Sequence, residues 1–319
     1  MSKQEMVSEP TYKTVATETS FAELFRILWL RKWIIVIVVV TSTSLAVLYS
    51  LSLPNIYKSE AQLAPASEEQ ASGLAGLAGQ FGGLASLAGV NLNEQSSGKV
   101  LLAIEVLKSR DFITNFIQKH DILLDLMAAE SWDFSTDQIL YDPTIYSVEL
   151  KQWVREVNPP LKPKPSLQEA YKQFRNITSV HQDEDTGMIF ISIKHPSPNV
   201  AKQWVELLIE DINATMKERD VMEANRSIKY LTEQINTTTI ADIKTVLYKL
   251  VEEQAKTIMF AEVRDEYVFK TIDSPISPEK KSGPKRALIC LFGLCFGLML
   301  GVFISLSLHF LRTTEHKSN

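Results

Sequence analysis

Few side chains in this chain of 319 residues could carry out catalysis or bind a metal. The five histidines have neither the HExxH pattern nor the spacing of a zinc site, and they stand at positions 120, 181, 195, 309 and 316. Both cysteines, Cys290 and Cys295, lie inside a long apolar run, so a soluble domain has no thiol to use. The GxSxG motif is also absent. We therefore expect no enzyme, no catalytic residues, no cofactor and no metal site.

The acidic residues offer one candidate cation site. Asp183, Glu184 and Asp185 follow one another between two strand-like segments. Their oxygens could hold a cation, but no EF-hand spacing follows, so a solvated hairpin tip is the favoured interpretation. The other carboxylates are spread along helical faces, where a solvated surface explains them. A catalytic site assembled only by the fold remains the alternative.

Composition indicates a folded protein and argues against a nucleic-acid partner. The chain is 45% hydrophobic and 22% charged, with a net charge of -5. This length and composition suit one large or two small domains. The mild acidity is the opposite of the basic footprint that nucleic-acid binding requires.

Two apolar runs are long enough to cross a membrane. The second, from Ala287 to Phe310, carries no charged residue and contains Gly293, Gly297, Gly301 and Ser305 at intervals of four. Such a stripe of small residues predicts a surface for close helix packing or oligomer contact, although glycine is also simply common in membrane helices. The first run covers residues 33–53. The long polar tail before it and the lack of a cleavage site argue against a signal peptide.

Basic residues set the expected orientation. Arg26, Arg31 and Lys32 precede the first run, which places the N-terminus in the cytoplasm. Two spans then return the C-terminus to the same side. A further basic cluster, residues 280–286, lies on the external side in this assignment, but long loops translocate largely regardless of charge. The expected divisions are a cytoplasmic tail (1–32), a span (33–53), an external domain (54–286), a span (287–310) and a cytoplasmic tail (311–319).

The external domain has the pattern of an α+β protein. Strands are expected at 56–64, 145–154, 177–180 and 188–194, where Ile189, Ile191 and Ile193 alternate with other residues. Helical spacing covers 99–130, and Ser166 can cap a further helix. Residues 158–165 are rich in proline and predict an extended surface turn. Residues 71–89 are rich in glycine and leucine, and they fit a loop or a helix that forms only when packed.

The longest helical signal predicts an arm. Ser197 and Pro198 begin it, and apolar residues then recur every three or four positions. Asn236 to Thr238 interrupt the pattern, and Thr239 with Asp242 resembles a capping box that restarts a helix. The first segment alone would be roughly 57 Å long. We therefore expect an extended helical arm over about 198–266 that reaches away from the membrane or packs on neighbouring copies.

A proline-rich segment leads from the domain to the second span. A strand at 267–272 closes the domain, and Pro275, Pro278 and Pro284 follow. Proline withholds a backbone donor and keeps the preceding residue out of the helical region. We expect these prolines to form a stiff extended collar.

The chain resembles the Wzz-type polysaccharide chain-length determinants, which are polysaccharide co-polymerases. The resemblance rests on two terminal spans, the sequence PNIYKSEA from Pro54, AKQWV from Ala201, EEQAKTIM from Glu252, and the proline-rich approach to the glycine-striped span. It covers nearly the whole chain. The glycine- and leucine-rich segment at 71–89 is not regarded as universal in that family.

The resemblance implies a bacterial inner-membrane protein with a periplasmic α/β base domain, a long helical arm and a homo-oligomeric ring. It also implies work beside the O-antigen polymerase on lipid-linked polysaccharide, where the protein sets the modal chain length of lipopolysaccharide. A short C-terminal tail and the lack of a Walker motif separate it from co-polymerases that carry a tyrosine kinase. The alternatives are a periplasmic adaptor or scaffold of another export system, a transmembrane sensor, and an enzyme acting on polysaccharide.

Overall fold

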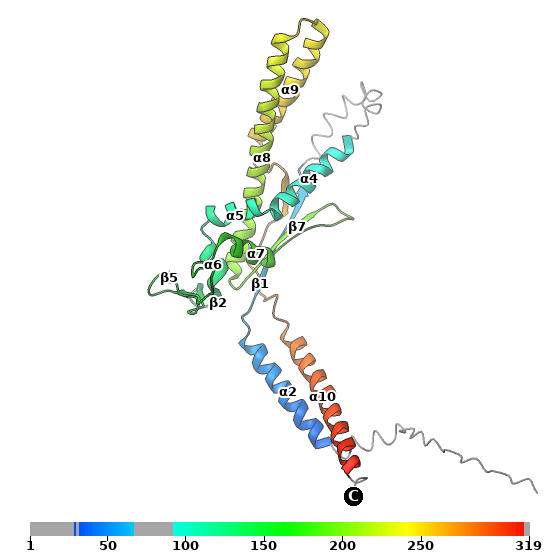
Figure 1. Cartoon of the computed structure of the whole chain (residues 1–319). Coiled ribbons are helices and arrows are strands. Elements are labelled where there is room, and N and C mark those ends of the chain that lie inside the picture. Colours follow the sequence, from blue (N-terminus) through cyan, green and yellow to red (C-terminus); the bar gives the residue numbers. More distant parts are fainter. Residues whose placement is uncertain (1–28, 30–31, 67–91, 316–319) are drawn as a thin grey trace, which may run out of the picture. The chain divides into compact units, whose positions relative to one another are not determined.

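The computed structural model describes residues 29, 32–66 and 92–315. The polar N-terminal tail up to residue 28, the segment at 71–89 and residues 316–319 lie outside the described residues. The chain divides into two compact units. One contains the two apolar helices, and the other runs from Pro54 to Pro284. Figure 1 shows the elements of each unit.

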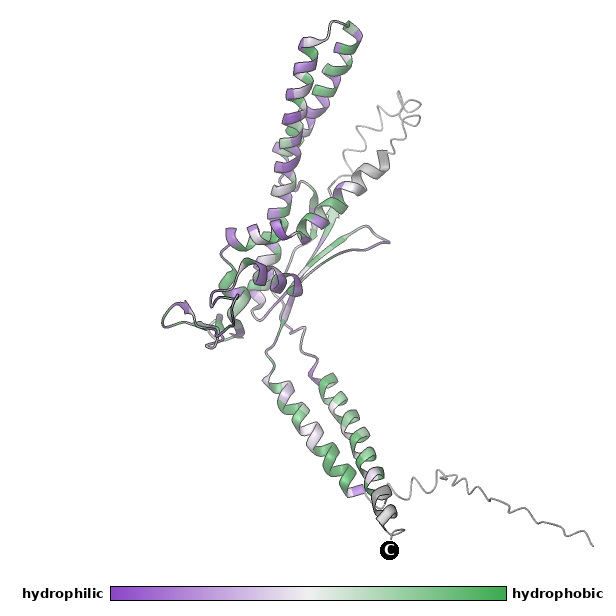
Figure 2. Cartoon of the chain, viewed as in Figure 1, coloured by the Kyte–Doolittle hydropathy of each residue, from purple (hydrophilic) through white to green (hydrophobic). Residues whose placement is uncertain are grey.

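The first unit consists of the helices α2 (Lys32–Ser52) and α10 (Arg286–Glu315). Both are long and apolar enough to cross a membrane, over Lys32–Ser52 and Arg286–Leu308. Figure 2 shows that hydrophobic residues cover them on nearly all sides, which is the pattern of a helix whose surroundings are apolar. Arg286 ends the polar approach to α10 and donates to the carbonyl of Leu53, 3.2 Å away.

A four-stranded antiparallel sheet with the order β6-β7-β1-β8 forms the centre of the second unit. Its strands are β1 (Tyr57–Pro65), β6 (Thr178–Gln182), β7 (Ile189–His195) and β8 (Phe269–Asp273). Tyr57 pairs with His195 and Leu63 with Ile189. The alternation expected for β7 is confirmed, because Ile189, Ile191 and Ile193 are completely buried. They belong to one core with apolar residues of α8 and of the shorter helices.

Four short helices cover the sheet: α4 (Leu92–Lys108), α5 (Arg110–Lys119), α6 (Leu123–Ala128) and α7 (Leu167–Ile177). The helical pattern expected over 99–130 is confirmed, but it is broken twice. Ser109 caps α5 by accepting from the Phe112 amide, and Asp121 adopts a positive φ of 48° before α6. The predicted cap at Ser166 is confirmed as a complete capping box with Glu169.

Two small hairpins extend from this domain. The first joins β2 (Ala129–Asp133) to β3 (Gln138–Tyr141), and the second joins β4 (Tyr146–Ser147) to β5 (Gln152–Trp153). The single strand expected over 145–154 is therefore wrong. The chain reverses within it, because the Ser147 hydroxyl accepts from the Leu150 amide and Lys151 takes a positive φ of 50°.

The helical arm is an antiparallel pair of helices, α8 (Pro198–Thr237) and α9 (Ala241–Val263). The predicted start is confirmed, since Ser197 caps α8 and Pro198 is its first residue. Forty residues give α8 a length of about 60 Å. The predicted capping box of Thr239 and Asp242 is wrong. Helix α9 begins at Ala241, and its N-cap, Ile240, makes no side-chain bond.

Candidate functional site

The small residues of α10 lie against α2. A Cβ atom built at Gly297 would lie 2.9 Å from the Cβ of Ser42 and 3.0 Å from the Cα of Val39. At Gly301 it would lie 3.1 Å from the Cα of Ile35, and at Gly293 it would overlap the Ala46 side chain. These approaches leave no room for a larger side chain. The stripe on α10 thus faces the other apolar helix of the same chain.

Hydrogen bonding contributes to the same helix pair. The Ser42 hydroxyl donates to the carbonyl of Gly293 over 2.8 Å. The last member of the stripe, Ser305, is fully buried, and its hydroxyl has no hydrogen-bond partner in the described part of the chain. Close packing of Gly293, Gly297 and Gly301 thus dominates, with one polar contact between backbone and side chain added to it. That this packing serves assembly is a proposal, and we return to it below.

The three collar prolines lie in a segment without helix between β8 and α10. Pro275 is buried, and Pro278 and Pro284 are partly buried. Backbone groups fix this segment beside β1: Ile56 pairs with Gly283 and donates to its carbonyl over 2.9 Å. The Ser59 hydroxyl donates to the Ile276 carbonyl over 2.8 Å. The entering and leaving segments of the domain are therefore joined to each other. The stiffness of the collar stays a prediction.

Two buried polar side chains fix the lower part of α8. The Asn213 side-chain oxygen accepts from the amides of Val268 and Phe269, at 2.8 and 3.0 Å, and its amide donates to the Phe269 carbonyl. Asp211 is buried as well, and it is paired with Lys119 at 2.7 Å and His120 at 2.8 Å. The Asp211 carboxylate raises the pKa of Lys119 through this hydrogen bond. The arm is thus attached to β8 on one side and to α5 on the other.

A third tie lies higher on α8, at Asp220. The Tyr267 hydroxyl donates to this carboxylate over 2.6 Å, and Lys99 of α4 forms an ion pair with it. The Lys99 ammonium also lies 4.1 Å from the centre of the Tyr267 ring. Burial, followed by the bond to Asp220, raises the pKa of Tyr267, which therefore stays protonated and donates. One carboxylate thus connects α4, α8 and the segment that follows α9.

Beyond these ties the arm keeps apolar side chains exposed. On α9, Ile243, Val246 and Leu250 are spaced three and four apart and are about half exposed. Within α9, only Ala261 is fully buried. Figure 2 shows hydrophobic and hydrophilic residues mixed along both arm helices, in contrast to α2 and α10. The outer arm therefore presents an apolar row that its partner helix does not cover.

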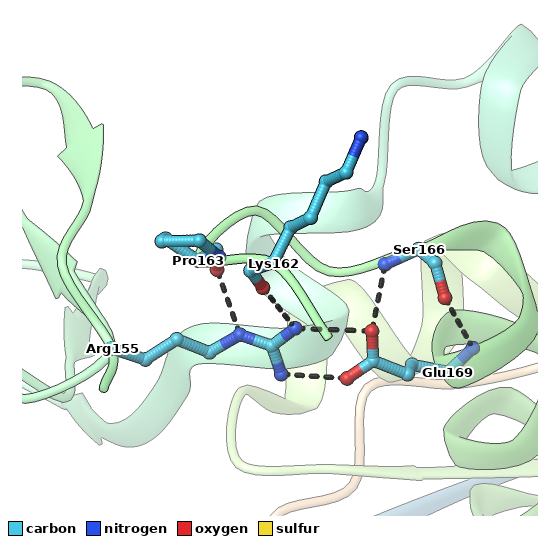
Figure 3. A network of polar contacts seen from close by, with 5 residues as sticks. All are labelled: Arg155, Lys162, Pro163, Ser166 and Glu169. Carbon is cyan, nitrogen blue, oxygen red and sulfur yellow. Dashed lines mark hydrogen bonds and ion pairs between the residues drawn. The ribbon is translucent and has the colours of Figure 1, made fainter. Parts of the chain in front are cut away.

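A polar network around Arg155 orders the proline-rich segment before α7, and it is drawn in Figure 3. The guanidinium forms a two-pronged contact with the Glu169 carboxylate, at 2.7 and 3.0 Å, and donates to the carbonyls of Lys162 and Pro163. Glu169 also accepts from the Ser166 amide over 2.9 Å. The hydrogen bond from Arg155 is the main cause that lowers the pKa of Glu169 to about 2.

This pKa shift predicts a pH dependence of stability. Because the ordinary value is 4.5 and the folded value about 2, the contribution is complete above the ordinary pKa and is lost as the pH falls toward 2. We expect Glu169→Gln to lower the stability of the full chain by about 1 to 2 kcal/mol near neutral pH. The gap to wild type should shrink by about pH 3. Thermal unfolding in detergent measures this. Glu223→Gln, an exposed carboxylate on α8, is the control, and an equal gap at both pH values would contradict the assignment.

The titratable groups most suited to chemistry have structural roles. His195 is buried, which lowers its pKa, and it accepts from the Ser197 amide and donates to the Asp125 carbonyl. The acidic turn is a hairpin tip as expected, with the Asp183 carboxylate bound to Thr186. Among the described residues, no three His, Cys, Asp or Glu side chains could hold a metal ion together. A shallow cavity of about 310 Å³ lies beside Pro54, and its lining includes Ala129 and Glu130.

Sequence reasoning did not single out Asp211, Asn213 or Arg155. The first two interrupt the apolar positions of α8 where that helix crosses the sheet, and a polar residue inside a buried helical stretch is a signal that could have found them. No comparable signal exists for Arg155, because its partners are defined only once the chain folds back on α7.

The fold defines an α+β protein with two candidate membrane spans near its termini, a base domain between them and a long helical arm. Residues 17–120 match the family model described as "Wzz: Chain length determinant protein". Over these residues the chain belongs to the Wzz chain length determinant family, as the resemblance predicted. Chain-length regulators of this family are non-catalytic, which agrees with the expectation of no enzyme.

Two solved structures are similar to the chain. One is described as a full-length bacterial polysaccharide co-polymerase, with 13% identity, a TM-score of 0.39, and coverage of 92% of this chain and 99% of the other. The second is a fragment of WzzB, a polysaccharide co-polymerase from Salmonella Typhimurium, with 11% identity, a TM-score of 0.29, and coverage of 72% and 100%. At these TM-scores the likenesses carry no argument. A search of curated proteins finds no match.

Proposed function

We propose that this protein is a non-catalytic regulator of the modal chain length of O-antigen or a related surface polysaccharide. It acts in the bacterial inner membrane as a homo-oligomer beside the polymerase and its lipid-linked polysaccharide. The observation that carries the proposal is the match of residues 17–120 to the chain length determinant family. The basic residues before the first span support cytoplasmic termini and a periplasmic base domain.

The arm supports a mechanism based on assembly. Its apolar row at Ile243, Val246 and Leu250 lacks cover within the chain, and contact with an identical copy would remove this surface from water. Identical copies that meet through a head-to-tail surface close into a ring when the rotation allows it. A ring repeats each weak contact with the polymer or the polymerase, and the effective concentration then multiplies their effect. Chain length would thus follow from the geometry of the assembly.

The mechanism predicts how charge changes on the arm act. Glu210 and Lys229 are exposed on α8. We expect Glu210→Lys or Lys229→Glu to shift the modal length while total polymer changes by less than about twofold, because exposed charges contribute little to folding. The lipopolysaccharide ladder of a deletion strain that expresses each variant measures this, and Lys229→Arg is the control with unchanged charge.

Two outcomes of this experiment would count against the proposal. Wild-type protein that leaves the ladder of the deletion strain unregulated would remove the function itself. A single carboxylate-to-amide change that stops polymer synthesis in a folded, oligomeric protein would indicate catalysis instead of assembly.

A further inference from the structure

The tips of the two small hairpins carry exposed apolar side chains. Phe134, in the turn between β2 and β3, is 85% exposed. Val148 and Leu150, in the turn between β4 and β5, are 61% and 65% exposed. We call these three residues the hairpin tips. A protein surface that faces only water seldom places its largest apolar side chains at the ends of its loops, so the tips call for a partner.

The hairpins are ordered up to these tips. The Asp133 carboxylate accepts from the Ser135 amide and from the Thr136 hydroxyl, at 2.9 and 2.8 Å, and the Trp132 indole donates to Asp137. The Trp132 ring meets the Phe134 ring edge-on, with centroids 5.7 Å apart. Behind the second tip, the rings of Tyr146 and Trp153 form a similar contact at 5.4 Å. Each apolar tip is therefore held on a firm turn backed by an aromatic pair.

Both hairpins lie at the end of the domain where the chain enters and leaves. The ring of Trp132 contacts Tyr57, the first residue of β1, with centroids 5.7 Å apart. The start of β2 lines a cavity together with Pro54 and Ile56, and Ile56 pairs with Gly283. The second hairpin joins the first through the ring contact of Tyr141 and Tyr146. Figure 1 shows β2 and β5 at this end of the domain, away from the arm.

Chain length keeps this end close to the bilayer. Helix α2 ends at Ser52 and β1 starts at Tyr57, so the extended link spans at most about 17 Å. The link from Gly283 to the first residue of α10, Arg286, is shorter still. The polar layer of a bilayer is about 5 to 8 Å thick on each side of the hydrocarbon. Aromatic side chains favour this layer, because it accepts an apolar ring beside polar groups.

We propose that the hairpin tips rest in the headgroup layer of the membrane that α2 and α10 cross. The inference rests on the membrane insertion included in the proposed function. Phe134, Val148 and Leu150 alternate with polar neighbours along their turns, so they form narrow points and not the flat face that a second copy would need. Together with the paired segments at Ile56 and Gly283, the tips give the domain additional points of support and fix its tilt on the membrane.

A fluorescent label placed at a tip tests this directly. The full chain with Cys290→Ser and Cys295→Ser has no other cysteine, so Phe134→Cys can be labelled alone. The labelled protein is reconstituted into phosphatidylcholine–phosphatidylglycerol vesicles with nitroxide-bearing lipids. Ser52→Cys, at the end of α2, is the positive control. Met222→Cys, an exposed apolar position on the arm, is the matched negative control.

We expect a loss of fluorescence at positions 134 and 52 and none at 222. Quenching at 52 without quenching at 134 would overturn the inference and leave the membrane insertion intact. The absence of quenching at both 52 and 134 would overturn the insertion, and the inference with it. A blue-shifted but unquenched label at 134 that reverts to a water-exposed spectrum in nanodiscs with one copy would assign the tips to a neighbouring copy, which also overturns the inference.

Discussion

Replacing Gly293 and Gly297 together with leucine is expected to separate α2 from α10 and to disturb the regulation of polymer length. Leucine at 293 would overlap Ala46, and leucine at 297 would meet the Ser42 side chain and the Val39 backbone. Overpacking costs about 1 to 3 kcal/mol per site, and in lipid no hydrophobic driving force compensates the loss of close packing. The base domain, which has its own core, should remain folded.

Cross-linking of the detergent-solubilised oligomer and the lipopolysaccharide ladder measure the effect, and protease resistance of the base domain reports its folding. The matched control is Phe292→Leu with Phe296→Leu, one residue before each glycine. Both phenylalanines are exposed on the outer side of the pair, so this change leaves the packed surface intact. Unchanged cross-links and an unchanged ladder in the glycine variant would show that the packing of the spans has no part in assembly.

Local signals in the sequence predicted the elements that they govern. Ser166 with Glu169 and Ser197 with Pro198 each mark a helix start, because the bonds that cap a helix lie within a few residues of one another. The alternation of isoleucines in β7 was equally readable, since a strand with one buried face repeats every two residues.

The failures lie where the chain turns back. Thr239 and Asp242 have the spacing of a capping box, but the turn from α8 into α9 uses residues 238–240, so the helix starts too late for Thr239 to cap it. The segment 145–154 reads as one strand because it holds no glycine or proline, and its reversal depends on Ser147 and on the positive φ of Lys151. Neither pattern encodes the direction in which the chain leaves an element.

The polar ties of the arm were out of reach for a different reason. Asp211 and Asn213 fall within the apolar pattern of α8, but their partners are 91 and 56 residues away in the sequence, at His120 and Phe269. Helical spacing predicts which face is buried and not which distant backbone group a buried amide will meet. The spacing of the small residues on α10 predicted a packing face, whereas its partner, α2 of the same chain, required the structure.

Removal of the Asn213 amide is expected to destabilise the base domain most among changes to a single side chain at the root of the arm. Asn213→Leu keeps the approximate volume but leaves the buried amides of Val268 and Phe269 without their acceptor. An unsatisfied buried group costs about 1 to 3 kcal/mol, so we expect a loss of about 3 kcal/mol. For a domain of this size this corresponds to a fall of about 6 to 12 °C in the unfolding midpoint of the full chain in detergent. The control is Asn225→Leu, exposed on the same helix, which should stay within about 0.5 kcal/mol of wild type. Because β8 leads directly into the collar segment and α10, Asn213→Leu should also weaken control of polymer length. Equal midpoints for both variants would mean that β8 is held to α8 by packing alone.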